Sequence, residues 1–203
     1  KGLTDSLNVK HIHAVVGGSL GGMQVLEWGI LYGDMISYLF PIATTARHSD
    51  WAIAFGEVER NAITNDPAWN AGWYNEQPRA GLSLARKIAM ISYRTSVSFN
   101  QKFSRKKLGG MKSDSFNVGK YLSYQGEKLV DRFDANAYIN LTRIMDRHDV
   151  SAERGTIEEV LGEVKCKVIS IGVSSDLLYP IEDQKLIAKL IPHAEYQEIE
   201  SAH

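Results

Sequence analysis

The chain has 203 residues, a formal net charge of -1, 44% hydrophobic and 23% charged residues, which is typical of a globular protein with one sizeable core. The small charge argues against a nucleic-acid or membrane surface. No apolar run reaches the roughly 20 residues of a membrane span, and the first residues lack a signal-peptide core. A single cysteine, Cys166, excludes an internal disulfide, so we expect a cytoplasmic protein.

The first predicted strand leads into a serine flanked by glycines. Residues 11–16 form an apolar, β-branched run that predicts a buried strand, and helical spacing follows to about residue 32. Between them, Gly17-x-Ser19-x-Gly21 fits the nucleophile elbow of α/β-hydrolase-type enzymes. There the serine sits in strained backbone at a helix N-terminus, its neighbours must be small, and free N–H groups can stabilise an oxyanion. A phosphate-binding glycine loop is the alternative, but the lysine that ends such a motif is absent.

The middle of the chain changes from sheet to helix character. Residues 35–42 predict a second buried strand, parallel to the first. From 49 to 155 the periodicity is helical, with helices expected at 49–63, 79–94, 117–130 and 135–146, and with 96–103 as an extension of the second. We interpret this block as a helical cap over an active site.

Sheet character returns near the end of the chain. Residues 164–172 predict a strand, 173–180 a loop, 181–190 a helix and 194–199 a final strand. The expected fold class is therefore α/β, a mostly parallel sheet flanked by helices. Residues 1–45 and 156–203 form its core, and residues 46–155 form the inserted cap.

A serine nucleophile needs a base and an acid that orients the base, and in this fold the order is serine, acid, histidine. Asp176 follows the strand after the cap, where the acid is expected, although a plain turn aspartate is the alternative. Asp183 is better explained as negative charge at a helix N-terminus. Position alone favours His203 as the base, and the other histidines are interpreted as surface or core residues.

Four stretches, residues 17–24, 81–94, 124–138 and 174–180, carry a resemblance to the homoserine O-acetyltransferase family, acyltransferases on the α/β-hydrolase fold. The resemblance implies that Ser19 is the acyl-accepting nucleophile, Asp176 the triad acid and the Leu20 backbone N–H an oxyanion donor, where the family usually has Met. It also implies that Arg86 and Tyr93 hold the amino-acid acceptor. These two residues lie two helical turns apart on one face, and arginine suits a carboxylate. An ordinary ion pair of Arg86 is the alternative.

The chain departs from the family pattern at both ends. The family histidine belongs to a Gly-His-Asp motif, and Ser201-Ala202-His203 resembles the residues just before it. We therefore do not assign His203 as the base and expect the catalytic histidine beyond residue 203. Strands that normally precede the elbow are also missing, so we expect an internal fragment of a larger enzyme, with little or no activity by itself.

The expected reaction transfers acetyl from acetyl-CoA to L-homoserine through an acetyl-serine, with ping-pong kinetics, in methionine biosynthesis. No cofactor or metal is implied besides the co-substrate acetyl-CoA, and the resemblance suggests a homodimer through the cap helices. The alternatives are a serine hydrolase (esterase or thioesterase), a transferase that uses succinyl-CoA or takes serine as acceptor, and a non-catalytic binding module. The basic stretch 102–112 is interpreted as a solvated charged loop, and a binding site for the CoA phosphates is the less favoured alternative. Cys166 is interpreted as a packed mid-strand residue.

Overall fold

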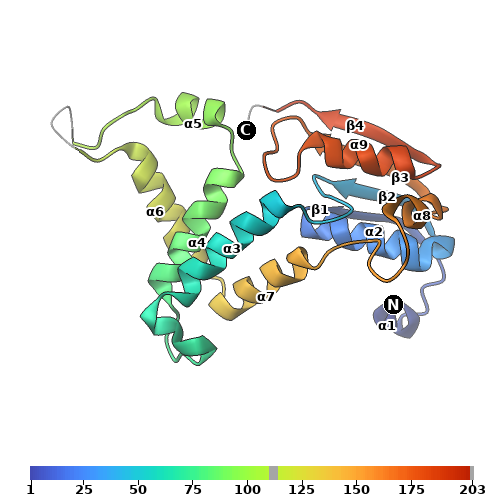
Figure 1. The fold of residues 1–203 in the computed structure, drawn as a ribbon, viewed down its shortest axis with the longest axis horizontal. Coiled ribbons are helices and arrows are strands. Elements are labelled where there is room, and N and C mark those ends of the chain that lie inside the picture. The colour runs from blue at the N-terminus through green and yellow to red at the C-terminus, as the bar shows by residue number, and fades with distance from the viewer. Residues whose placement is uncertain (110–113, 202–203) are drawn as a thin grey trace. The chain divides into compact units, whose positions relative to one another are not determined.

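The computed structural model describes residues 1–109 and 114–201. Within these ranges the chain divides into two compact units, Lys1–His48 with His148–Ser201, and Ser49–Arg147. The two ends of the chain (blue and red) therefore build the first unit, and the middle (cyan to yellow) builds the second (Figure 1). Residues 110–113, which include Lys112 of the basic stretch, lie outside the described part.

The first unit is built on a parallel sheet of four strands. These strands are β1 (Ile12–Gly18), β2 (Ile36–Ile42), β3 (Lys167–Val173) and β4 (Ala194–Ile199), neighbours in that order. The helical elements of this unit are α1 (Gly2–Ser6), α2 (Leu20–Tyr32), the 3-10 turn η1 (Gly33–Met35), α8 (Ile157–Gly162) and α9 (Ile181–Leu190). The parallel pairing that the sequence predicts is confirmed.

Apolar side chains from strands and helices form the core of this unit. Leu39 on β2 and Val168 on β3 are partners in register, and each is at most 1% exposed. Leu26 of α2 and Ile187 of α9 belong to the same buried cluster. Burying each such side chain contributes about 1.5–3 kcal/mol, so this cluster holds both helices against the sheet.

Three features of this unit differ from the expectation. Strand β1 is the edge strand of the described sheet and is not buried, since Val16 is 63% exposed. Strand β3 begins at Lys167, so the buried Cys166 lies just before the strand instead of in its middle. Helix α8 was not expected at all, although Thr156 and Glu159 form a capping box that marks its start.

The second unit is helical. It contains α3 (Asp50–Thr64), the 3-10 segment η2 (Pro67–Gly72), α4 (Arg79–Ser92), α5 (Ser96–Phe103), α6 (Asn117–Val130) and α7 (Ala135–Asp146). Its apolar core includes Ile63, Leu82, Ala85, Leu129 and Ile139. Among the described helices of both units, none is long and apolar enough to cross a membrane.

The inward face of α3 is not the one that apolar spacing alone suggests. Trp51 and Val58 are more than half exposed, whereas Glu59 and Arg60 are buried. Ser49 is the N-cap, accepting a hydrogen bond from the Ala52 N–H, and Asp50 is the first residue of the helix.

Two expectations for the next helices are also wrong. Helix α5 is separate from α4, because the Thr95 side chain caps it by accepting from the Ser98 N–H. The helical spacing of apolar residues in α4 predicts that Leu84 and Ile91 point inward, but each is about half exposed.

The chain leaves and re-enters the first unit through two paired segments. Arg47 and Asp149 form an antiparallel bridge. On either side of it, the His48 N–H donates to the His148 carbonyl (2.9 Å) and the Val150 N–H donates to the Ala46 carbonyl (3.0 Å). The helical unit is therefore an insertion whose two connections start side by side.

Candidate active site

Ser19 occupies a strained turn between β1 and α2. Its backbone angles are φ 53° and ψ -123°, a conformation that costs a non-glycine residue about 1–3 kcal/mol. The turn is held because the Ser19 N–H donates to the Ile42 carbonyl (2.9 Å) and the Thr44 hydroxyl donates to the Ser19 carbonyl (2.8 Å). The side chain is exposed at the carboxyl end of the strand, so the hydroxyl is accessible and the geometry is that of a nucleophile elbow.

The three glycines around Ser19 differ in how much space a Cβ atom would have at their positions. A Cβ at Gly17 would lie 2.4 Å from the Gly21 carbonyl oxygen, so only glycine fits there. A Cβ at Gly21 would meet nothing within 4 Å, which contradicts the expectation that this position itself must be small. A Cβ at Gly22 would lie 2.6 Å from the Thr44 Cβ, so the helix start packs directly on the loop after β2.

Leu20 is the first residue of α2. Backbone N–H groups in the first turn of a helix have no acceptor within the helix, and the helix dipole is positive there. The Leu20 N–H thus has the position that an oxyanion donor needs, beside the candidate nucleophile. Since only its backbone is used, the side chain at this position is free to vary.

Asp176 lies in the loop after β3. All four strands are parallel, so this loop and the Ser19 turn lie at the same carboxyl edge of the sheet. Asp176 Oδ1 accepts hydrogen bonds from the Leu178 and Tyr179 N–H groups, both at 2.9 Å. Burial raises the pKa of Asp176, and the bonds from Tyr179 and Leu178 act against that rise. Its Oδ2 makes no hydrogen bond within the described residues, so the turn role leaves one oxygen for a histidine.

Three histidines of the sheet unit make contacts with neighbouring residues of that unit. His148 Nε2 lies 3.0 Å from the Thr45 carbonyl, and burial lowers the pKa of its ring. His11 Nε2 lies 2.9 Å from Ser37 Oγ, and the His13 ring packs edge-on against Tyr38. His203 lies outside the described residues, so the position of the base stays a prediction.

Arg86 of α4 lies close to Tyr93, the residue that follows this helix in the helical unit. The Arg86 guanidinium lies 5.4 Å from the centre of the Tyr93 ring, as their spacing of two helical turns predicts. The Tyr93 side chain is 51% exposed. Desolvation of its hydroxyl and the nearby Glu59 carboxylate nevertheless raise its pKa, against the effect of Arg86.

Two residues that sequence reasoning missed complete this cluster. Glu59 of α3 is 6% exposed and accepts a hydrogen bond from the Tyr138 hydroxyl of α7 (2.8 Å). Burial raises the pKa of Glu59 to about 7, although Tyr138, Arg60 and Arg86 favour the carboxylate. A signal was available, because Glu59 continues the stripe of buried residues at Ala52, Gly56 and Ile63.

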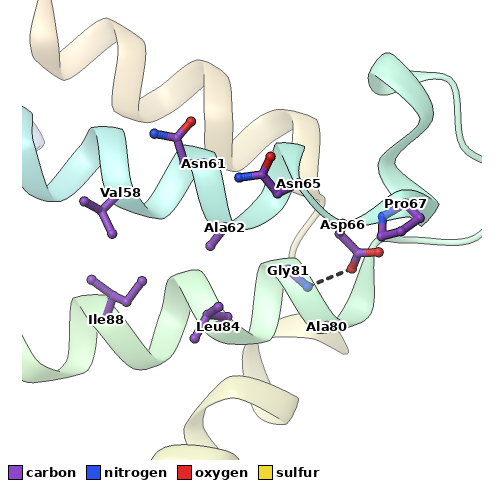
Figure 2. A pocket seen from close by; sticks show the side chains of 10 residues that line it. All are labelled: Val58, Asn61, Ala62, Asn65, Asp66, Pro67, Ala80, Gly81, Leu84 and Ile88. Carbon is purple, nitrogen blue, oxygen red and sulfur yellow. Dashed lines mark hydrogen bonds between the residues drawn. The ribbon is translucent and has the colours of Figure 1, made fainter.

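A groove of about 490 Å³ runs between α3 and α4 of the helical unit (Figure 2). Apolar side chains of Val58, Leu84 and Ile88 line its length, and Asp66 closes one end. The Asp66 carboxylate accepts from the Gly81 and Ala68 N–H groups, so it is occupied structurally. The groove therefore offers an apolar surface and no catalytic group.

Comparison with known proteins gives three findings. The model of the alpha/beta hydrolase fold family matches residues 3–203. The homoserine O-acetyltransferase of Chloroherpeton thalassium is 44% identical over 205 residues, which cover 100% of this chain and 53% of that protein. The resemblance drawn from the sequence is thereby confirmed, and the chain spans about half the length of the curated relatives it matches.

Solved structures agree on the fold. The homoserine O-acetyltransferase from Bacillus anthracis superposes with a TM-score of 0.92 at 25% identity, over 99% of this chain and 57% of that one. The acetyl esterase MekB superposes with a TM-score of 0.83 at 29% identity, over 98% of this chain and 57% of that one. Transferases and hydrolases thus share this arrangement.

Proposed function

The chain belongs to the α/β-hydrolase fold family, and from that membership we propose that its complete protein is a homoserine O-acetyltransferase. The observation that supports this proposal most strongly is the position of Ser19 in the strained turn before α2. The whole of this chain is 44% identical to part of a homoserine O-acetyltransferase. In this proposal Ser19 is the nucleophile, Asp176 the acid, and Leu20 supplies an oxyanion N–H. Acetyl-CoA is a co-substrate, and no resident cofactor or metal takes part.

The proposed reaction has two acyl transfers. Ser19 attacks the thioester carbonyl of acetyl-CoA while its proton passes to a histidine, and the Leu20 N–H stabilises the oxyanion. The intermediate collapses to acetyl-serine, and CoA leaves with the proton. The homoserine hydroxyl then gives its proton to the same base and attacks the acetyl-serine. O-acetyl-L-homoserine leaves, and Ser19 regains its proton.

The acceptor site separates this function from ester hydrolysis. We assign Arg86 to the acceptor carboxylate, which a guanidinium binds through two hydrogen bonds, and Tyr93 to the same acceptor. The short distance between the Arg86 guanidinium and the Tyr93 ring supports this assignment. A serine hydrolase is the second candidate, because the acetyl esterase MekB shares the fold at 29% identity. Methionine biosynthesis is the pathway that an O-acetyl-L-homoserine product would feed.

The test measures acyl transfer directly on the complete protein encoded by the reading frame. Acetyl-CoA is added without acceptor, and intact mass should reveal one acetyl adduct that is absent in Ser19→Ala. L-homoserine should discharge the adduct much faster than water or serine does. Discharge by water at the same rate would favour the hydrolase, and a protein that forms an adduct only from succinyl-CoA would refute the acetyl donor. The absence of any adduct would refute the nucleophile.

We also propose that the cap helices form a homodimer. The exposed apolar side chains of Val58 and Leu84, at the groove in Figure 2, support this proposal. Light scattering on the same preparation should give twice the chain mass, and Leu84→Asp should give the monomer mass. A monomeric wild type would refute it.

A further inference from the structure

Gln184 of α9 is a fully buried amide in the sheet unit. It has 0% exposure, although a buried amide is unfavourable unless its polar atoms are hydrogen-bonded. Its Nε2 donates to the Thr44 carbonyl (2.5 Å) and to the Tyr179 carbonyl (3.4 Å). Its Oε1 has no partner within the described residues. An apolar side chain would avoid the unpaired oxygen, so the two bonds made by Nε2 are what distinguishes glutamine at this position.

The two carbonyls belong to the two loops that carry the candidate catalytic residues. Thr44, in the loop after β2, donates its hydroxyl to the Ser19 carbonyl (2.8 Å). Tyr179, in the loop after β3, donates its N–H to Asp176 Oδ1 (2.9 Å). A continuous series of hydrogen bonds therefore runs from Ser19 through Thr44, Gln184 and Tyr179 to Asp176.

Helix α9 is also anchored to the sheet by a bond that does not involve the Gln184 side chain. The Ser170 hydroxyl of β3 donates to the Gln184 backbone carbonyl (2.9 Å), and Ser170 is as buried as Gln184. This bond holds the helix on the strand but does not reach either loop. Ser170→Ala therefore serves as a matched control that loosens α9 and leaves the series intact.

We propose that Gln184 is a positioning residue, which fixes the Asp176 loop relative to the Ser19 turn. The proposal rests on the proposed function, in which these two residues work through one histidine. Without the Nε2 donor, the Thr44 and Tyr179 carbonyls lose this hydrogen bond and the two loops lose their common donor. The histidine that Asp176 orients is then misaligned with Ser19, so acylation slows while donor binding is unchanged.

The test compares Gln184→Met with Ser170→Ala in the complete protein. Rapid-quench mass spectrometry gives the rate of acetyl-Ser19 formation, steady-state assays give kcat and KM for acetyl-CoA, and thermal unfolding gives Tm. We expect the Tm of both variants to fall below that of the wild type. Only Gln184→Met should acylate roughly 10- to 100-fold more slowly, at unchanged KM. Acylation by Gln184→Met at the wild-type rate would overturn the proposal. So would an equal loss in Ser170→Ala at a matched Tm.

A second variant covers the case in which Gln184→Met does not fold. In Gln184→Glu only the protonated carboxyl can donate to the Thr44 carbonyl, so the ratio of variant to wild-type acylation rate should rise as the pH falls. A ratio independent of pH would contradict the positioning role. Wild-type Ser19 that takes up no acetyl group would refute the proposed function itself. An acylated wild type with an unaffected Gln184 variant would refute only this inference.

Discussion

Replacing Glu59 with glutamine should stabilise the protein at high pH. The raised pKa means that the folded protein binds this proton more tightly than the unfolded chain does. The stabilising contribution of the protonated group is therefore present below about pH 4.5 and is lost as the pH rises through about 7. Glutamine stays neutral and can still accept from the Tyr138 hydroxyl, so it removes the penalty of the buried charge.

The size of the pKa shift of Glu59 sets the expected change in the free energy of unfolding. A rise from 4.5 to about 7 corresponds to roughly 3 kcal/mol, at about 1.4 kcal/mol for each pKa unit. Most of this difference should develop between pH 5 and pH 8. Urea unfolding of wild type and Glu59→Gln across that range should therefore show a gap in unfolding free energy that widens by roughly 2–3 kcal/mol in favour of the variant.

Glu57 of the same helix provides a control, because its pKa is shifted in the opposite direction. Glu57 is exposed, and a hydrogen bond from Arg60, with its charge, lowers the pKa of the Glu57 carboxyl. Its stabilising contribution is present at neutral pH and is lost on acidification, so Glu57→Gln should be less stable than wild type at pH 7 and equal to it at low pH. If the Glu59→Gln gap does not change with pH, burial of an ionisable Glu59 is refuted.

The remaining predictions concern backbone geometry. Gly126→Ala should destabilise by about 1–3 kcal/mol, because its Cβ would overlap the Ser83 hydroxyl of α4. Gly119→Ala, on the same helix with nothing within 4 Å, should stabilise by about 0.5–1 kcal/mol; chemical denaturation measures both, and equal effects would contradict the close contact. Ser19→Gly should unfold at a higher temperature than Ser19→Ala, since only glycine relieves the φ of 53°. Equal melting temperatures of Ser19→Gly and Ser19→Ala would argue against strain at the turn.

Sequence pattern predicted regular elements well where one period ran through them. The helices α6 and α7 and the strand β4 have the bounds that the sequence pattern predicts. Hydrophobic spacing predicted the wrong buried face where a polar side chain is buried and an apolar one is exposed. Glu59 is buried and accepts a hydrogen bond from the Tyr138 hydroxyl, while Trp51 on the same helix is exposed. Tyr138 belongs to α7, which is distant in sequence, so local pattern does not reveal this partner.

The candidate site was predictable in parts. The elbow follows from local spacing, since Gly17 and Ser19 are set by a turn of a few residues. The pairing of Arg86 with Tyr93 follows from helical periodicity alone. The bond from Gln184 to the Thr44 carbonyl was not predictable, because it joins segments 140 residues apart. The catalytic roles of these residues remain predictions.

The paired segments around Arg47 and Asp149 have a consequence for how this protein can diversify. Backbone hydrogen bonds at His48 and Val150 fix the two attachment points within the sheet unit. The entropy of closing a loop grows only slowly with its length. Insertions, deletions or exchange of whole helices between those points therefore leave the Ser19 turn in its setting. The helical unit can therefore change in sequence and length while the sheet unit that holds the Ser19 turn keeps its structure.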